Sequence, residues 1–151
     1  MGKLKLLIAC LAVCSIIISA SGCIGGKKIH DGEFMTFEYP KDWTVTGACG
    51  PNFYGGGDVV LFDKHGHGIG IMSVTNETLQ TFEEEWAEET APGFWEWCGK
   101  KKIGNVECSI YEGGHGITYI FQKDGTVFQV DCPIEVEYVA EDIIKSIKPK
   151  K

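Results

Sequence analysis

The sequence contains no arginine. Its 14 basic residues are all lysines, and they stand against 21 aspartates and glutamates, for a formal net charge of −7. Arginine is the side chain best suited to bidentate recognition of phosphates and base edges. An acidic chain without it is a poor partner for nucleic acid or anionic lipid headgroups. We therefore expect no nucleic-acid partner, and we interpret the net charge as a contribution to solubility.

The short motifs of common hydrolases and zinc sites are also missing. There is no G-x-S-x-G nucleophile elbow and no H-E-x-x-H helix, and no two cysteines are spaced as C-x-x-C. The run Gly55–Gly57 is not followed by the Lys-Ser/Thr of a phosphate-binding loop, so it indicates a turn. We therefore expect neither catalysis nor a cofactor.

No apolar run reaches the length of about 20 residues that a stable membrane span needs. The first 22 residues have the layout of a secretory signal: Lys3 and Lys5, an apolar stretch over Leu6–Ile18, and small residues before Cys23. An uncleaved N-terminal helix is the alternative. In both cases the positive N-terminus places the rest of the chain outside the cell.

The segment Ala20–Cys23 resembles the lipobox of lipoproteins, whose cysteine is lipidated and becomes the new N-terminus. The run Ser21–Gly26 resembles those of surface lipoproteins from methanogenic archaea. We predict a signal peptide over residues 1–22, a lipid anchor on Cys23 and a tether over residues 23–32 that reaches at most about 30 Å. Residues 33–151 are then a single domain on the extracytoplasmic face of the cell membrane.

Four cysteines lie in this predicted domain: Cys49, Cys98, Cys108 and Cys132. An even number of cysteines in an exported domain favours disulfides, here two, with three possible pairings. Four free, buried thiols are the alternative, because the redox compartment rather than the spacing carries the prediction.

Beyond the tether the pattern is mostly that of strands. Alternating or apolar runs predict strands over residues 34–39, 43–48, 59–62, 69–74, 101–103, 106–111, 117–122 and 126–131. Asp124-Gly125 is a strong signal for a hairpin turn between the last two strands.

Two helices are expected in addition. The first has Leu79, Phe82 and Trp86 on one face, with Thr81–Glu84 as a capping box and Pro92-Gly93 at its end. The second is amphipathic over residues 136–147. Strands in sequential hairpins with two helices predict an α+β domain, an antiparallel sheet of roughly six strands covered by helices.

The ordered features resemble the PsbP-like family. The segment Phe37–Trp43 matches its F-x-Y-P-x-x-W opening, and Thr78-Leu79 with Phe82 matches its T-L-x-x-F helix start. Gly104, the hairpin Phe121–Gly125 and the closing helix Ile143–Ile147 follow in the family's order, so the similarity covers nearly the whole domain.

The best-known members of this family are extrinsic subunits on the lumenal face of photosystem II. The resemblance implies an antiparallel sheet between helices and a role in docking to membrane proteins rather than catalysis. Because the matching residues are aromatic and aliphatic residues of the fold, it assigns no functional residue. The lipoprotein start suggests a stand-alone surface relative outside photosynthesis.

One candidate metal site lies in the loop His65-Gly66-His67-Gly68. His65 and His67 could place two imidazoles on one side of an extended loop, with Asp63 or His115 completing the site. A polar hairpin loop is the simpler interpretation of the same residues, because only two ligands are close in sequence.

The stretch Phe94-Trp95-Glu96-Trp97 stands in an expected loop between Pro92-Gly93 and Gly99. Trp95 and Trp97 are candidate contacts for a partner protein, because exposed tryptophans are common hot spots. A lid over the core is the alternative, since large aromatic side chains are mostly buried. Asn76-Glu77-Thr78 is a glycosylation sequon, so Asn76 is a candidate acceptor.

These observations lead to a membrane-anchored, non-catalytic interaction module that docks against other membrane or surface proteins. A lipoprotein that binds a small ligand or a metal, through His65 and His67 or through Trp95 and Trp97, is the alternative. An enzyme of unknown type is the third hypothesis, which the missing motifs disfavour.

Overall fold

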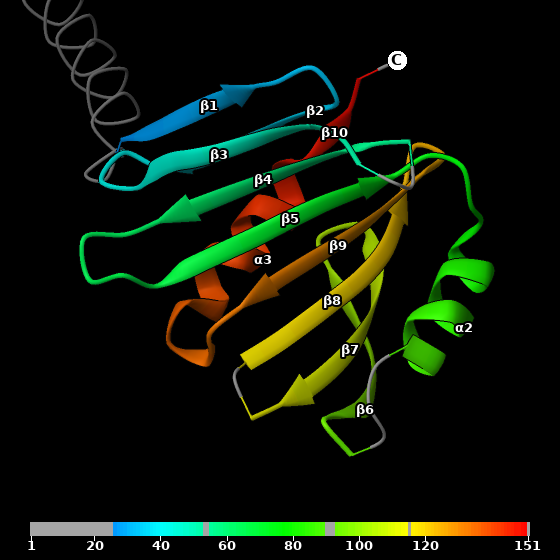
Figure 1. Ribbon diagram of the computed structural model, residues 1–151. Coiled ribbons are helices and arrows are strands. Elements are labelled where there is room, and N and C mark those ends of the chain that lie inside the picture. Colours follow the sequence, from blue (N-terminus) through cyan, green and yellow to red (C-terminus); the bar gives the residue numbers. More distant parts are fainter. Residues whose placement is uncertain (1–25, 53–54, 90–92, 115, 151) are drawn as a thin grey trace, which may run out of the picture.

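The computed structural model describes residues 26–52, 55–89, 93–114 and 116–150 (Figure 1). The predicted signal peptide, the lipid anchor Cys23 and His115 lie outside these residues, as does the side chain of Cys49.

Two antiparallel sheets form the domain. The larger has seven strands in the order β3-β4-β5-β9-β8-β7-β6, and the smaller has three in the order β1-β2-β10. The bounds of the larger sheet are β3 Thr44–Pro51, β4 Gly57–Phe62, β5 Gly68–Val74, β6 Trp95–Ile103, β7 Val106–Gly113, β8 Gly116–Lys123 and β9 Thr126–Cys132. Those of the smaller are β1 Lys27–Asp31, β2 Met35–Pro40 and β10 Lys148–Pro149.

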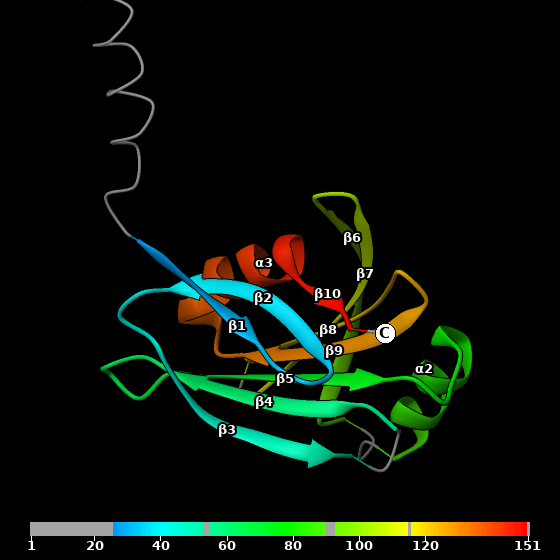
Figure 2. The same ribbon diagram turned by 90° about the horizontal axis from the view of Figure 1, so that it is seen from above.

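Two α-helices lie on opposite sides of the large sheet. Helix α2 (Leu79–Glu89) connects β5 to β6, and a 3-10 turn, η1 (Ile134–Val136), leads from β9 into α3 (Glu137–Ser146). Figures 1 and 2 show α3 beside the small sheet, with α2 at the opposite end of the molecule.

The main core lies between the large sheet, α3 and β2. Along β4, β5 and β9 every second side chain is buried on the inner face that meets α3, as the two-residue repeat of a strand requires. The amphipathic stripe of α3 supplies the opposing side chains Val139, Ala140, Ile143 and Ile144. Met35 and Phe37 of β2 join the same cluster, so one core holds both sheets together.

Lysines fasten α3 to the large sheet. The Lys123 ammonium donates to the carbonyl oxygens of Ile144 and Lys145, at 3.2 and 2.9 Å, where the last turn of the helix has unpaired acceptors. At the other end, the Tyr119 hydroxyl donates to a Glu137 oxygen at 2.7 Å, and Lys101 of β6 pairs with Glu137 and Glu141.

The outer face of the large sheet is only partly covered. Helix α2 packs against one end of it through Phe82, Leu79 and Trp86, and the sheet contributes Val74, Ile120 and Val127 to this second cluster. Within the described residues α2 lies only over this end, and the outer face of β4, β5 and β9 beyond it carries the site described below (Figure 1).

Most of the predicted strands and both helices are confirmed. The β8–β9 hairpin turns at Asp124 and Gly125 with φ of 50° and 84°, the left-handed conformation that the Asp-Gly signal predicts. The fold has more sheet than expected, however. Two sheets with ten strands among the described residues replace the predicted single sheet of roughly six.

Two additional strands, β1 and β10, and the first part of β6 lie where the sequence shows no clear strand pattern. Lys27–Asp31, assigned to the tether, pairs with β2 as β1, and Lys148–Pro149 pairs with the other edge of β2. The stretch from Trp95, assigned to a loop, is the start of β6. All three are edge strands or lie beside one, and their exposure to solvent removes the apolar alternation on which the prediction depends.

The predicted capping box of α2 is also wrong by three residues. The backbone N–H of Thr81 donates to the hydroxyl of Thr78 at 3.2 Å, and the helix begins at Leu79. Thr78 is therefore the capping residue. Thr81 lies in the first turn, where its hydroxyl and that of Thr78 are 2.8 Å apart.

Candidate functional site

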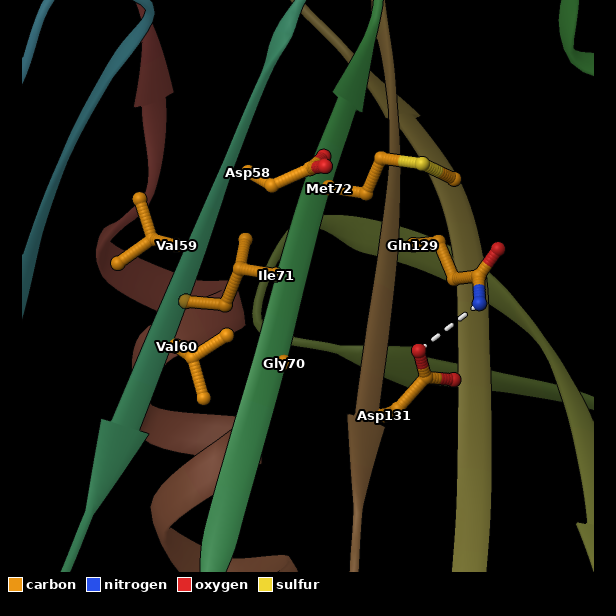
Figure 3. Close-up of a pocket in the computed structure, with 8 residues that line it drawn as sticks. All are labelled: Asp58, Val59, Val60, Gly70, Ile71, Met72, Gln129 and Asp131. Carbon is orange, nitrogen blue, oxygen red and sulfur yellow. Dashed lines mark hydrogen bonds between the residues drawn. The ribbon is translucent and has the colours of Figure 1, made fainter. Parts of the chain in front are cut away.

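The open part of the outer sheet face contains a row of four residues from neighbouring strands. Val60 pairs with Gly70, Gly70 with Asp131, and Asp131 with Thr118. Figure 3 shows Val60 and Asp131 on either side of Gly70, which has no side chain to fill the space between them. The row therefore has a gap at its centre, over β5.

Two cavities meet at this gap, and we call them together the outer groove. One has a volume of about 240 Å³ and the other about 380 Å³, and they share Val60, Gly70 and Asp131. The first extends along the sheet past Asp58, Met72 and Gln129 (Figure 3). The second extends towards Gly68, Trp95, Ile117 and Pro133.

Asp131 is the carboxylate at the centre of the outer groove. Its two oxygens accept hydrogen bonds from the Thr118 hydroxyl at 2.6 Å and from the Gln129 side-chain amide at 2.8 Å, the bond drawn in Figure 3. Burial raises the pKa of Asp131, and these two hydrogen bonds oppose the rise. Among the described residues no lysine or histidine forms an ion pair with it.

Gln129 presents a second acceptor. Its amide nitrogen faces Asp131, so its carbonyl oxygen Oε1 points the other way, and this oxygen is buried without a hydrogen-bond partner among the residues described. An unpaired buried carbonyl is costly. Because this oxygen is buried and points away from Asp131, it does not face the gap over Gly70.

The aromatic residues beside the outer groove form a connected group. Trp86 of α2 lies 4.5 Å from Tyr111 and 6.0 Å from Trp95, between ring centroids, and Phe94 lies 6.0 Å from Trp95. The structure divides the two tryptophans that the sequence singles out. Trp95 is half-buried and lines the groove, whereas Trp97 is 61% exposed.

Trp97 and Phe94, which we call the exposed aromatic pair, lie at the edge of the large sheet. Phe94 is 49% exposed and stands just before β6, the edge strand that carries Trp97. After Trp97 a bulge interrupts the pairing of β6 with β7, and Lys100, Lys101 and Lys102 follow. A bulge and lysines protect an edge against pairing with another strand, so any contact here would be made by side chains.

The loop with His65 and His67 is held by Asp63. The Asp63 carboxylate accepts from the backbone N–H groups of His65 and His67, at 2.8 and 2.9 Å, and lies 2.8 Å from Nδ1 of the His67 ring. Burial would raise the pKa of Asp63, but the hydrogen bonds from His67 and His65 outweigh it and lower the pKa to about 2. Asp63 thus has a structural role in the turn.

The same loop does not form a metal centre from the residues described. The His65 and His67 rings lie 6.2 Å apart, and in the described part of the chain no three His, Cys, Asp or Glu side chains converge to hold an ion. His115, the other predicted ligand, lies outside that part. A metal at His65 and His67 therefore stays a prediction.

The cysteines correct the prediction of two disulfides, because Cys98, Cys108 and Cys132 are free thiols. Cys108 pairs across the sheet with Phe121 and Cys132 with Ile117, and these partners are four residues apart on β8. That separation is about 13 Å along a strand, whereas the Cα atoms of a disulfide lie within about 7 Å.

Cys98 is also out of reach of its neighbour on β7. It sits in the bulge of β6, exposed, three positions before the Lys101 that pairs with the buried Cys108. Burial raises the pKa of both Cys108 and Cys132 to about 12, so these thiols are unreactive parts of the core.

Asn76 is exposed at the end of β5, which leaves the predicted sequon accessible. Its side chain lies beside Gly55: a Cβ added there would stand 2.6 Å from the Asn76 amide oxygen.

Across the described residues, no helix has both the length and the apolar character to cross a bilayer.

No protein-family model and no curated protein matches the chain. The solution structure of cyanobacterial PsbP (CyanoP) from Synechocystis sp. PCC 6803 does match, with a TM-score of 0.53 over 86% of this chain and 96% of that one. The fold is PsbP-like. The two sequences are 11% identical, so the likeness concerns the fold alone.

The PsbP-like fold confirms the resemblance that the sequence motifs indicate. Phe37, Trp43 and Phe82 of those motifs are buried, as expected for residues of the fold. The outer groove is a feature that sequence reasoning missed. The signal that could have indicated it was the pair of glycines, Gly68 and Gly70, in an apolar strand. A glycine there weakens the strand and often marks a site where a ligand or another backbone approaches closely.

Proposed function

We propose that the chain is a membrane-anchored extracytoplasmic lipoprotein whose PsbP-like domain docks, without catalysis, to other membrane or surface proteins. The observation that carries the proposal is the exposed aromatic pair at the edge of the large sheet, Phe94 and Trp97. Exposed tryptophan and phenylalanine are enriched at protein interfaces, where a few such side chains supply most of the binding energy.

The surroundings of this pair suit a side-chain contact with a protein. Phe94 packs against Trp95, which contacts Trp86 of α2, and Trp97 belongs to the paired strand β6, so the pair stands on ordered structure. The neighbouring lysines add little net charge to the rim, because Lys100 pairs with Glu107 and Lys101 with Glu137 and Glu141, so the apolar rings themselves are the main feature that a partner would contact.

The docking proposal is tested by chemical cross-linking in native membranes, followed by capture of the protein and mass spectrometry. The expected result is one reproducible partner whose yield falls about tenfold or more in Trp97→Ala, as truncation of a hot spot requires. Tyr138→Ala is the matched control, because Tyr138 is an equally exposed aromatic residue (69%) on α3, away from this edge. A partner retained equally by both variants, or no partner above background, contradicts the proposal.

The membrane anchor is tested separately. Cys23→Ser removes the only sulfur in the lipobox-like segment, so the variant should carry no lipid. Mass spectrometry of the N-terminal peptide from the membrane fraction measures this. Lipid-modified Cys23→Ser protein in that fraction would show that the chain is held in another way.

Small-ligand binding is the second candidate function, and the outer groove favours it. The groove is shallow and open, and it has the apolar walls and few polar groups that are typical of ligand sites. Metal binding at His65 and His67 has less support, because their loop is already held by Asp63.

A further inference from the structure

Gly70 leaves open a space that packing does not require to be empty. Its φ is ordinary, and a Cβ built on it meets nothing closer than the Asp131 carboxylate at 3.9 Å. At Gly56 and Gly116, by contrast, a Cβ would approach backbone oxygens to about 2 Å. A glycine inside a central strand lowers stability relative to a larger residue. We therefore interpret Gly70 as a residue that keeps this space open.

The polar group that faces this space is the Asp131 carboxylate. The Thr118 hydroxyl and the Gln129 amide nitrogen both donate to Asp131. The carboxylate has further lone pairs that can accept hydrogen bonds from a ligand. The complement of such a site is a group with several N–H donors and a positive charge.

The charge of the residues that line the groove also favours a cation. The lining of the two cavities includes the carboxylates of Asp58 and Asp131 and contains no lysine or histidine among the residues described. Asp131 thus has hydrogen bonds but no counter-ion. A partly buried carboxylate is stabilised most by a ligand that supplies both a positive charge and further hydrogen-bond donors.

The walls are suited to a short hydrocarbon stem. Val60 and Met72 line one side of the carboxylate, and Ile117, Pro133 and the indole of Trp95 line the other. An aromatic face also attracts an ammonium group or the polarised CH₂ beside it. The cavity volumes of about 240 and 380 Å³ suit a molecule of a few heavy atoms.

We infer that the outer groove binds a small ligand with a primary ammonium on an apolar stem, the ammonium on Asp131 and the stem over Gly70 towards Trp95. This site is separate from the exposed aromatic pair and goes beyond the docking function, so either can fail without the other. A divalent metal is a poor alternative, because no three His, Cys, Asp or Glu side chains of the described residues converge here and Asp58 already accepts a hydrogen bond from Asn52.

The test is calorimetric titration of the full chain in detergent micelles with n-butylammonium chloride. 1-Butanol is the matched control ligand, because it keeps the stem and lacks the charge and two of the three donors. Saturable binding of n-butylammonium, with 1-butanol binding at least about tenfold more weakly, is the expected result. Equal binding of the two compounds, or none by n-butylammonium, overturns the inference.

Two variants locate the site. Asp131→Asn should weaken n-butylammonium binding about tenfold or more, since it removes the charge and keeps the shape. Gly70→Val should abolish binding by filling the space, with no fall in melting temperature, because nothing opposes a Cβ there and valine favours strands. Gly70→Ala should fold like the unchanged protein and bind more weakly than it. Undiminished binding in Gly70→Val overturns the inference.

A primary ammonium on an alkyl stem is also the chemistry of a lysine side chain, and a further titration distinguishes the two sources. Nα-acetyl-lysine methylamide binding more tightly than n-butylammonium assigns the groove to a lysine of another protein. Weaker or equal binding assigns it to a free amine. Both results require the loss in Asp131→Asn, and its absence in both titrations counts against the ammonium site.

Discussion

Asp131 lowers the stability of the folded protein when its carboxylate is charged, because the fold buries this group. Its carboxylate is largely buried at the centre of the outer groove, and burial raises its pKa above the ordinary value of 3.8. The folded protein therefore binds this proton more tightly than the unfolded chain does. Stability contributed by the protonated form is lost as the pH rises from 3.8 through the raised pKa.

Asp131→Asn removes this titration and should change the pH dependence of stability. We expect the melting temperature of the variant, relative to that of the unchanged protein, to be higher at pH 7 than at pH 3, since only the unchanged protein buries a charge at pH 7. Thermal unfolding at both pH values measures it. A difference that is the same at pH 3 and pH 7 would contradict this account of Asp131.

The cysteine thiols differ in their exposure to solvent. Cys98 is exposed in a bulge, whereas Cys108 and Cys132 are in the core with their pKa raised to about 12. We expect Cys98→Ser to lose one rapidly reacting thiol when the native protein is titrated with Ellman's reagent, because only an accessible thiolate reacts. Cys108→Ser should leave the rapid phase unchanged. Loss of the rapid phase in Cys108→Ser instead would place the reactive thiol in the core.

Helix α2 begins at Leu79, the start that the T-L-x-x-F resemblance indicates and that the capping-box signal missed. The T-x-x-E signal at Thr81–Glu84 fits a capping box, but the chain enters the helix earlier, with the Thr81 N–H on the Thr78 hydroxyl. Leu79 and Phe82 pack against the sheet, and this packing decides where the helix can start.

The two threonines can be separated by substitution. Thr78→Ala should lower the free energy of unfolding by about 1 kcal/mol, the usual value of a capping hydroxyl. Thr81→Ala should cost less, because the backbone N–H at position 81 keeps its acceptor. Urea unfolding of the two variants decides between the two positions, and a larger loss in Thr81→Ala would favour the capping box.

Strand β6 is the element for which sequence reasoning was least informative. Its sequence Trp-Glu-Trp-Cys-Gly-Lys-Lys-Lys-Ile has no apolar alternation, because an edge strand over a partly open face has little surface to bury. The sequence singled out both tryptophans as candidate contacts, but their division between the groove and solvent depends on the neighbours that β7 and α2 bring to them.

At the scale of the whole molecule, both ends of the described chain meet at β2. Strand β1 pairs with one edge of it and β10 with the other, and the backbone N–H of Lys150 donates to the carbonyl of Phe34 at 2.9 Å. Met35 and Phe37 of β2 belong to the main core, so the pairing of the two ends closes over that core.

Removal of residues 148–151 should therefore destabilise the entire domain. Each lost backbone hydrogen bond contributes about 0.5–1.5 kcal/mol, so we expect the free energy of unfolding to fall by about 1–3 kcal/mol. Lys150→Ala is the control: it removes only the exposed ion pair with Asp31, which is worth little, and leaves the backbone in place. Urea unfolding that gives the truncated chain and Lys150→Ala the same stability would show that β10 does not matter.

Local signals in the sequence were sufficient to predict several elements. The alternation along residues 69–74, the Asp-Gly turn at 124–125 and the apolar stripe of residues 136–147 each predict their structure, because the backbone period and the turn conformation depend only on near neighbours. The order of these elements was enough to indicate a PsbP-like fold.

The outer groove, the free thiols and the pairing of β1 and β10 with β2 depend on contacts between residues far apart in the sequence, so they could not be predicted from local patterns. Gly70, Asp131 and Thr118 come from three strands, and no local pattern states that they share a row. The same holds for Cys108 and Cys132, whose distance depends on the register of the strand between them. Register and strand order follow from long-range burial, so a site made of cross-strand neighbours appears only when the sheet is assembled.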